Sequence, residues 1–109
     1  GYPILALPPG RRDLHRYLRD LEQVLIETLL PLGLNPGRRP GFTGVWVGEH
    51  KLASIGVAVR RWVTWHGFSL NVRNDLARLG GFDSCGLAPG TMGRVLDRVP
   101  VPAGDPLLA

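Results

Sequence analysis

Three β-type stretches follow one another between residues 44 and 72, and only two short turns separate them. Their sequences are GVWVG, KLASIGVAVRR and WVTWHGFSLNV, which are rich in the β-branched and aromatic residues that strands favour. The residues GEHK join the first two stretches, and the pair RR joins the second to the third. Connections this short join antiparallel neighbours, because a parallel pair needs a long crossover. The run therefore predicts a mostly antiparallel meander.

The segment before the meander predicts a helix that packs on the sheet. From Asp13 onward, apolar residues recur three and four positions apart, as on one face of an amphipathic helix. Asp13 is a suitable N-cap, Pro31 should end the helix, and Gly33 can cap it. The apolar stripe consists of Leu14, Tyr17, Leu18, Leu21, Val24, Leu25 and Leu29, and the charged residues, Glu22 included, mostly fall outside it.

These elements set the expected fold class. The first residues, GYPILAL, alternate like a short buried strand, and NDLARLGGF is expected to form one helical turn after the meander. The class is therefore α/β (α+β), with a mixed, mostly antiparallel sheet and packing helices. The length of 109 residues suits a single domain, 1–109, in which the tail at 103–109 is expected to be frayed.

The charge of the chain is basic, which bears on its partners. The formal net charge is +4 at pH 7. Such a balance suggests an acidic partner, which could be a nucleic acid, an acidic protein or a phosphate, although solvated arginines would give the same count. The pair Arg38–Arg39, in the predicted loop LNPGRRPGFTG, leaves the same two interpretations open.

Several kinds of site and location are disfavoured. One cysteine cannot form an intrachain disulfide, a multi-cysteine zinc site or an iron–sulfur cluster, and the three histidines lack a metal-ligand spacing. No stretch of about 18 apolar residues predicts a membrane span. GYPILAL has no basic region of the kind that begins a signal peptide. We therefore expect a cytoplasmic protein.

The lone cysteine, Cys85, lies in the glycine-rich stretch GGFDSCGLAPG. A thiolate there could attack an acyl group, because the backbone N–H groups of such a loop can hold the tetrahedral oxyanion. An inert, buried cysteine is the alternative. Lys51, the only lysine, could stabilise the thiolate or act as a base, or it could simply be exposed at a strand end. His66 could pair with Cys85, or it could be an ordinary core or edge histidine.

Two glycines interrupt the β pattern, in SIGVAV and in HGFSL. Gly56 and Gly67 should weaken their strands, and such glycines often mark a bulge or the close approach of a ligand. An extended apolar ligand lying across the sheet would account for both.

Taken together, these motifs resemble a known family. The stretch FTGVWVGEHKLASIGVAVRRWVTWHGFSLNV followed by CGL is similar to the lipoate-protein ligase B family, the octanoyltransferases of lipoate biosynthesis. The resemblance extends from Tyr2 to about Met92. The family's N-terminal signature, R-G-G-x-x-T-x-H, is absent, so the resemblance implies a partial catalytic domain from the C-terminal portion of such an enzyme.

The resemblance also implies roles for particular residues. Cys85 would carry the octanoyl thioester, and Lys51 would lower the pKa of its thiol and then handle protons. Six residues would line the acyl site from two strands: Ser54, Ile55, Gly56, Gly67, Phe68 and Ser69. The implied fold is the one shared by biotin and lipoate protein ligases.

The implied partners follow from the same resemblance. Octanoyl-acyl carrier protein would donate the acyl group, and lipoyl domains of 2-oxoacid dehydrogenases and the glycine cleavage H protein would accept it. No metal, nucleotide cofactor, nucleic acid or membrane is implied.

Two further alternatives stay open. One is an ATP-dependent lipoate or biotin ligase-like enzyme, although those relatives use a lysine without a nucleophilic cysteine. The other is an inactive fragment or a small basic binding module in which Cys85 is inert.

Overall fold

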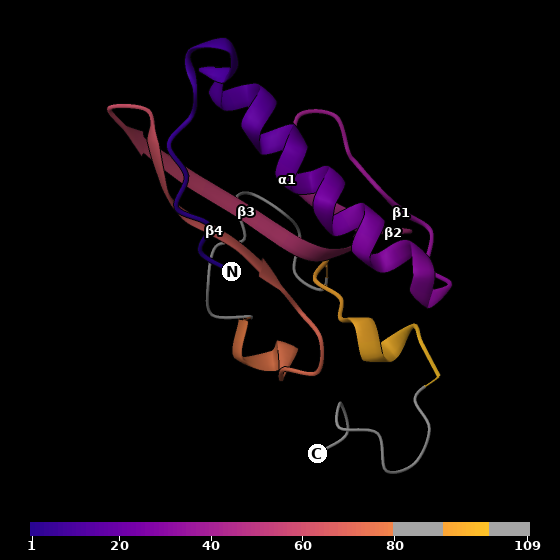
Figure 1. Ribbon diagram of the computed structural model, residues 1–109. Helices are drawn as coiled ribbons and strands as arrows, with labels where there is room; N and C mark the ends of the chain where they lie inside the picture. The colour runs from indigo at the N-terminus through magenta and orange to yellow at the C-terminus, as the bar shows by residue number, and fades with distance from the viewer. Residues whose placement is uncertain (80–90, 101–109) are drawn as a thin grey trace.

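The computed structural model describes residues 1–79 and 91–100, with side chains placed up to residue 77 in the first range. One helix, α1 (Leu14–Leu29), lies across a four-stranded antiparallel sheet (Figure 1). The strands are β1 (Pro36–Gly37), β2 (Gly44–Val47), β3 (His50–Arg60) and β4 (Val63–Leu70), and they adjoin one another in chain order. The expected class and the antiparallel meander are confirmed, with β1 added at its edge.

The ends of α1 follow the sequence signals. The carboxylate of Asp13 accepts a hydrogen bond from the backbone N–H of Arg16, as an N-cap does. The helix ends at Leu29, and the residues around Pro31 form a short 3-10 turn, Leu30–Leu32. Gly33 then caps this turn with a left-handed φ of 82°. The predicted cap, end and closing glycine are therefore confirmed.

The buried face of α1 differs from the predicted stripe at two kinds of position. Val24 is 54% exposed, so its assignment to the core was wrong. Ile26 and Glu22 are buried instead. The helix is rotated over the sheet so that its carboxyl-terminal half faces β2 and β3, where the main core lies. That core consists of Leu25, Ile26, Leu29, Leu34, Val45, Leu52, Ala53 and Val95.

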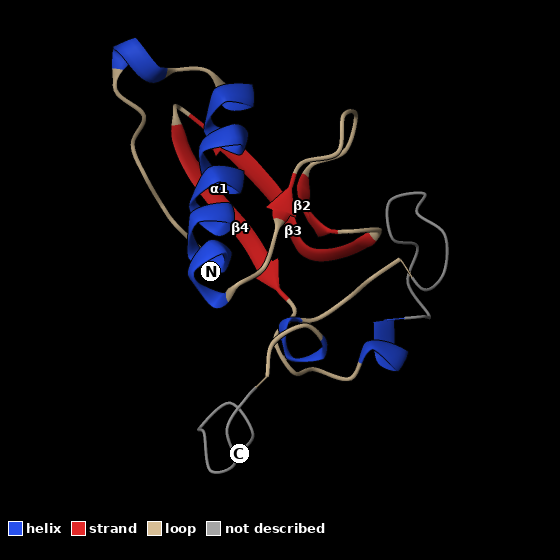
Figure 2. Cartoon of the chain, turned by 90° about the vertical axis from the view of Figure 1, so that its right-hand side faces the viewer, coloured by secondary structure: helices blue, strands red, loops and turns tan. Residues whose placement is uncertain are grey.

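The hairpin of β3 and β4 is the longest feature of the sheet (Figure 2). Its strands pair without a register shift from Ala53–Leu70 to Arg60–Val63. Arg61 and Trp62 form the turn, with positive φ values of 51° and 61°. Such a pair matches the right-handed twist of the flanking strands, which favours the tight hairpin.

The N-terminal segment does not form the predicted buried strand. It runs extended beside β4, where Leu5 accepts a hydrogen bond from Thr64 N at 2.8 Å and Leu7 donates one to Trp62 O at 2.7 Å. However, Tyr2 and Ile4 are exposed, because this segment lies at the outer edge of the sheet.

The other short elements are 3-10 turns at Pro9–Arg11, Leu76–Leu79 and Val95–Asp97. The turn at Leu76–Leu79 confirms the expected helical turn after the meander. The predicted frayed tail at 103–109 lies outside the described residues. Within the described ranges, no helix is both long enough and apolar enough to cross a membrane.

Candidate active site

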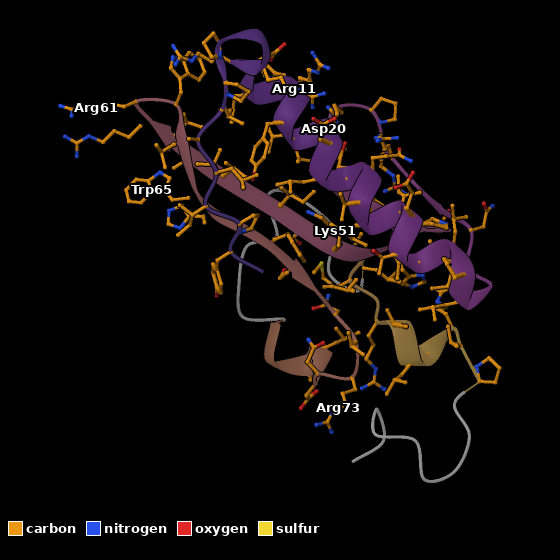
Figure 3. All side chains as sticks on the ribbon, in the orientation of Figure 1. Arg11, Asp20, Lys51, Arg61, Trp65 and Arg73 are labelled. Atoms are coloured by element: carbon orange, nitrogen blue, oxygen red, sulfur yellow. The ribbon has the colours of Figure 1, made fainter. Side chains whose placement is uncertain are left out.

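Lys51 is buried at the start of β3, with 6% of its surface exposed, so the exposed strand-end interpretation was wrong. Its backbone N–H donates to the carbonyl of Thr91 at 2.7 Å, and its carbonyl accepts from Gly93 N at 2.9 Å. The segment around Met92 therefore lies parallel to this end of β3. Lys51 lies in the middle of the molecule, whereas Arg61 and Arg73 project at its periphery (Figure 3).

An aromatic ring holds the Lys51 side chain. Trp46 is the cross-strand partner of Lys51 on β2, next to a register shift between Val45 and Trp46. The Nζ atom of Lys51 lies 5.3 Å from the centroid of the indole, which is the range of a cation–π contact. Trp46 is 3% exposed, and no hydrogen-bond partner for its Nε1 exists within the described part of the chain.

The same indole also contacts the loop between β1 and β2. The guanidinium of Arg39 lies 5.4 Å from the ring centroid, and the ring of Phe42 meets it edge-on at 6.2 Å. Arg38, in turn, bonds to the carboxylate of Glu22 on α1. Arg38 and Arg39 therefore both make contacts within the chain, although Arg38 stays exposed, so both interpretations of the pair stay predictions. No periodic signal marks this cluster in the sequence, because its members come from a loop and from two different strands, β2 and β3.

Two hollows share the predicted residues Ser54 and Ile55, and Lys51 lines the first of them. The first, the Lys51 cavity, has a volume of about 400 Å³. It is lined by Gly41, Phe42, Thr43, Lys51, Ser54, Ile55 and Met92. The second, the glycine groove, has a volume of about 380 Å³ and lies across β3 and β4. It is lined by Tyr2, Ser54, Ile55, Gly56, Gly67, Phe68 and Ser69.

The strand register brings the six predicted substrate-site residues together. Ser54 pairs with Ser69, Ile55 with Phe68, and Gly56 with Gly67, so three residues from each strand lie side by side along the glycine groove. Sequence reasoning missed Tyr2 as a lining residue, since GYPILAL was predicted to be a buried strand.

The two groove glycines are needed for different reasons. A Cβ built on Gly56 would have no neighbouring heavy atom within 4 Å, so this glycine leaves open space in the groove. A Cβ on Gly67 would overlap the Gly1 carbonyl and would lie 2.8 Å from Pro3 Cδ. Gly67, with φ at +155°, thus permits close approach of the N-terminal segment of the chain itself.

Two further chemical candidates are Cys85 and His66. Cys85 lies outside the described residues, so its relation to Lys51 stays a prediction. His66 has a positive φ of 61° and an exposed ring that stacks on Trp65 at 5.2 Å, as an edge histidine would. It lines neither hollow, and its pairing with Cys85 also stays a prediction. In the described ranges, no three His, Cys, Asp or Glu side chains gather as metal ligands would.

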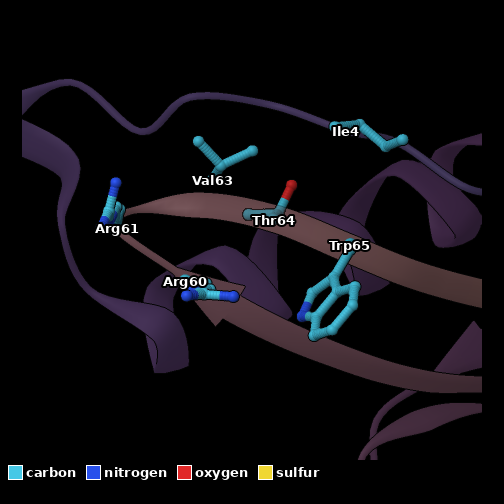
Figure 4. A pocket seen from close by; sticks show the side chains of 6 residues that line it. All are labelled: Ile4, Arg60, Arg61, Val63, Thr64 and Trp65. Carbon is cyan, nitrogen blue, oxygen red and sulfur yellow. The ribbon is translucent and has the colours of Figure 1, made fainter.

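A third hollow lies at the turn end of the hairpin, away from Lys51 (Figure 4). Its volume is about 500 Å³. It is lined by Ile4, Arg60, Arg61, Val63, Thr64 and Trp65, none of which was predicted as a site residue.

Comparison with known proteins identifies the family. The sequence profile described as "Lipoyl protein ligase A/B catalytic domain" matches residues 1–90. An octanoyltransferase from Geobacter metallireducens is 50% identical over 96% of the chain, and one from Gloeobacter violaceus is 49% identical over all of it. In both cases the chain spans 50% of the length of the relative.

The fold has a solved counterpart as well. A candidate lipoate protein ligase from T. acidophilum, solved with bound lipoic acid, superposes with a TM-score of 0.69. The match covers 94% of this chain and 44% of the other, at 21% identity, which establishes the shared fold. The chain belongs to the lipoyl protein ligase A/B catalytic domain family.

Proposed function

We propose that this chain contributes the acyl site of an octanoyltransferase. The donor is octanoyl-acyl carrier protein, and the acceptor is a lysine of a lipoyl domain of a 2-oxoacid dehydrogenase or of the glycine cleavage H protein. Cys85 carries the octanoyl group between them as a thioester, and Lys51 assists both transfers. The similarity to octanoyltransferases of two bacterial genera supports this assignment.

One structural observation carries most of the proposal. The Lys51 cavity and the glycine groove share Ser54 and Ile55, so a buried amine and an open surface for a chain adjoin each other. Gly56 leaves room for methylenes over the surface of the paired strands. An octanoyl chain on this surface gains from apolar burial, at about 0.8 kcal/mol per methylene.

The first transfer forms the acyl-enzyme. The Sγ of Cys85 attacks the thioester carbonyl carbon, and backbone N–H groups near Gly86 stabilise the oxyanion. The new C–Sγ bond replaces the C–S bond to the carrier, whose thiolate leaves with a proton from the ammonium of Lys51. A cation close to Sγ also favours the thiolate form before the attack.

The second transfer moves the octanoyl group from Cys85 to the acceptor lysine. The acceptor amine attacks the acyl-enzyme carbonyl, an amide C–N bond forms, and the C–Sγ bond breaks. The proton released from the amine passes to Lys51, which returns to the ammonium form. The cycle therefore closes without any other reactant.

The transfer assay that tests the function contains octanoyl-acyl carrier protein, a lipoyl domain, and the protein at its full native length, without ATP. We expect an octanoylated lipoyl domain by mass spectrometry, and a rate at least 100-fold lower for Lys51→Ala, as is typical when a group acting in acid–base catalysis is removed. Transfer from free octanoate that requires ATP would instead establish a ligase. No transfer from either donor would refute both enzymes.

A further inference from the structure

A buried carboxylate beside the Lys51 cavity has no part in the proposed chemistry. Glu22 is fully buried on α1, although the helical pattern placed it outside the apolar stripe. Oε1 accepts from Arg19 Nη1 at 2.5 Å and from Arg38 Nε at 3.2 Å, and Oε2 accepts from Gly44 N at 3.0 Å. A buried charge is tolerated only when it is paired and hydrogen-bonded in this way.

The hydrogen bond to Gly44 fixes backbone that touches Lys51. A Cβ built on Gly44 would lie 2.7 Å from Lys51 Cε and 2.6 Å from the carbonyl oxygen of Ala53. The backbone of Gly44, with φ at +153°, is therefore packed directly against the lysine side chain. Any movement of this residue alters the space that Lys51 occupies.

The hydrogen bond to Arg38 fixes the other end of the same loop. Arg38 also donates to the carbonyl of Arg19 at 3.1 Å and to Oε1 of Gln23 at 3.0 Å, so its guanidinium is anchored along α1. Between Arg38 and Gly44, the loop supplies Gly41, Phe42 and Thr43 to the described lining of the Lys51 cavity. One carboxylate thus anchors both ends of the loop segment 38–44, which forms this wall of the Lys51 cavity.

We propose that Glu22 is a positioning residue, which sets the wall of the Lys51 cavity by holding Arg38 and Gly44 to α1. The relevance to acyl transfer rests on the proposed function, but the positioning itself does not. Glu22 acts through the loop, because its hydrogen-bond partners within the described residues are Arg19, Arg38 and Gly44.

The variant Glu22→Gln separates this role from packing. The amide has nearly the same shape, so the helix keeps its buried volume. Its single carbonyl oxygen can accept from Gly44 or from Arg38, but its NH₂ group cannot accept from either. One end of the loop is therefore released, and a charge-assisted bond, the stronger kind, is lost.

Lys51 is the only lysine among these 109 residues, so the peptide that contains it reports on a single side-chain amine. Acetylation by an N-hydroxysuccinimide ester, followed by peptide mass spectrometry, reports the rate at which this amine becomes accessible. The reaction is run on the protein at its full native length, well below the unfolding temperature. Leu21→Ala is the matched control, because Leu21 is a neighbouring buried residue of α1 in a cluster with Leu7 and Tyr17.

We expect Glu22→Gln to be acetylated at Lys51 roughly fivefold faster or more, the effect of a modest local loss of stability. Leu21→Ala should stay within about twofold of the unsubstituted protein. Equal rates for Glu22→Gln and the unsubstituted protein, or equal increases in both variants, would overturn the proposal. If Glu22→Gln does not fold, Arg38→Met provides the same test, with the same two outcomes.

The transfer assay adds a second, separable outcome. If the unsubstituted protein transfers octanoyl groups, Glu22→Gln should raise the KM for the donor and lower kcat, whereas Leu21→Ala should change neither below its melting temperature. If no transfer is seen at all, the proposed function fails, while the acetylation rates still decide whether Glu22 positions the wall.

Discussion

Replacing Gly56 with valine should separate acyl binding from stability. The position lies in β3, and a Cβ there meets no heavy atom within 4 Å, so the larger side chain enters the glycine groove rather than the core. Valine is favoured in strands, and the loss of a strand glycine should raise the free energy of unfolding by about 0.5–1 kcal/mol. The folded protein is therefore expected to be at least as stable.

The effect on catalysis can be estimated from the groove. If the valine side chain displaces about two methylenes of the octanoyl chain, the lost burial is about 1.6 kcal/mol. That corresponds to roughly a 15-fold fall in kcat/KM for octanoyl-acyl carrier protein. A hexanoyl donor, which reaches less far, should lose less. The ratio of octanoyl to hexanoyl kcat/KM is thus the sensitive quantity.

The assay compares both donors with Gly56→Val and with Ala58→Val. Ala58 follows two residues later on β3 and shares its side of the strand, but it does not line the groove. Ala58→Val should leave the donor ratio within about twofold, because the added bulk lies on the same side of the sheet but outside the groove. An unchanged octanoyl rate in a folded Gly56→Val protein would refute the acyl groove.

Three further predictions concern stability, and urea unfolding measures each. Gly44→Ala should lower the free energy of unfolding by about 2–4 kcal/mol, because the new Cβ would lie 2.6 Å from a β3 carbonyl oxygen. Gly48→Ala, whose Cβ would lie in open space, should lower it by only about 1 kcal/mol, and equal losses in the two variants would contradict this. Leu29→Ala should cost about 3–5 kcal/mol, since Leu29 is 1% exposed in the core, and a loss under about 1 kcal/mol would show a different packing. The hydrogen bond from Arg94 holds the pKa of Asp97 below its ordinary value. The pair therefore stabilises the fold fully at pH values above the ordinary pKa, and this contribution is lost as the pH falls through the lower pKa of the folded state. Asp97→Asn should therefore lower the urea midpoint slightly at pH 7 but not at strongly acid pH. A difference in midpoint between the variant and the unsubstituted protein that does not change with pH would contradict the linkage.

Local signals in the sequence predicted the framework. The N-cap at Asp13, the break at Pro31 and the glycine at 33 set the limits of α1, because capping and ring sterics act within a few residues. The meander was predictable for a similar reason, since short turns permit only antiparallel neighbours. The six groove residues could be placed together because the register of one hairpin decides which of them face each other.

The parts that could not be predicted depend on contacts between distant segments. Glu22 looks like a solvated residue on the helix, and only the return of Arg38 and Gly44 to α1 explains its burial. The indole of Trp46 contacts Arg39 from a loop and Lys51 from β3, and no periodicity in the sequence predicts such a cluster. The N-terminal segment is apolar like a buried strand, but its position at the sheet edge leaves Tyr2 exposed.

The acyl-enzyme itself is the most direct test of the central claim. The protein at its full native length is mixed with octanoyl-acyl carrier protein, without an acceptor, and its intact mass and peptide map are recorded. We expect one octanoyl group, attached to Cys85, which is absent from Cys85→Ala and forms more slowly in Lys51→Ala. An unmodified protein that still catalyses transfer, or an octanoyl group that persists in Cys85→Ala, would contradict the thioester mechanism.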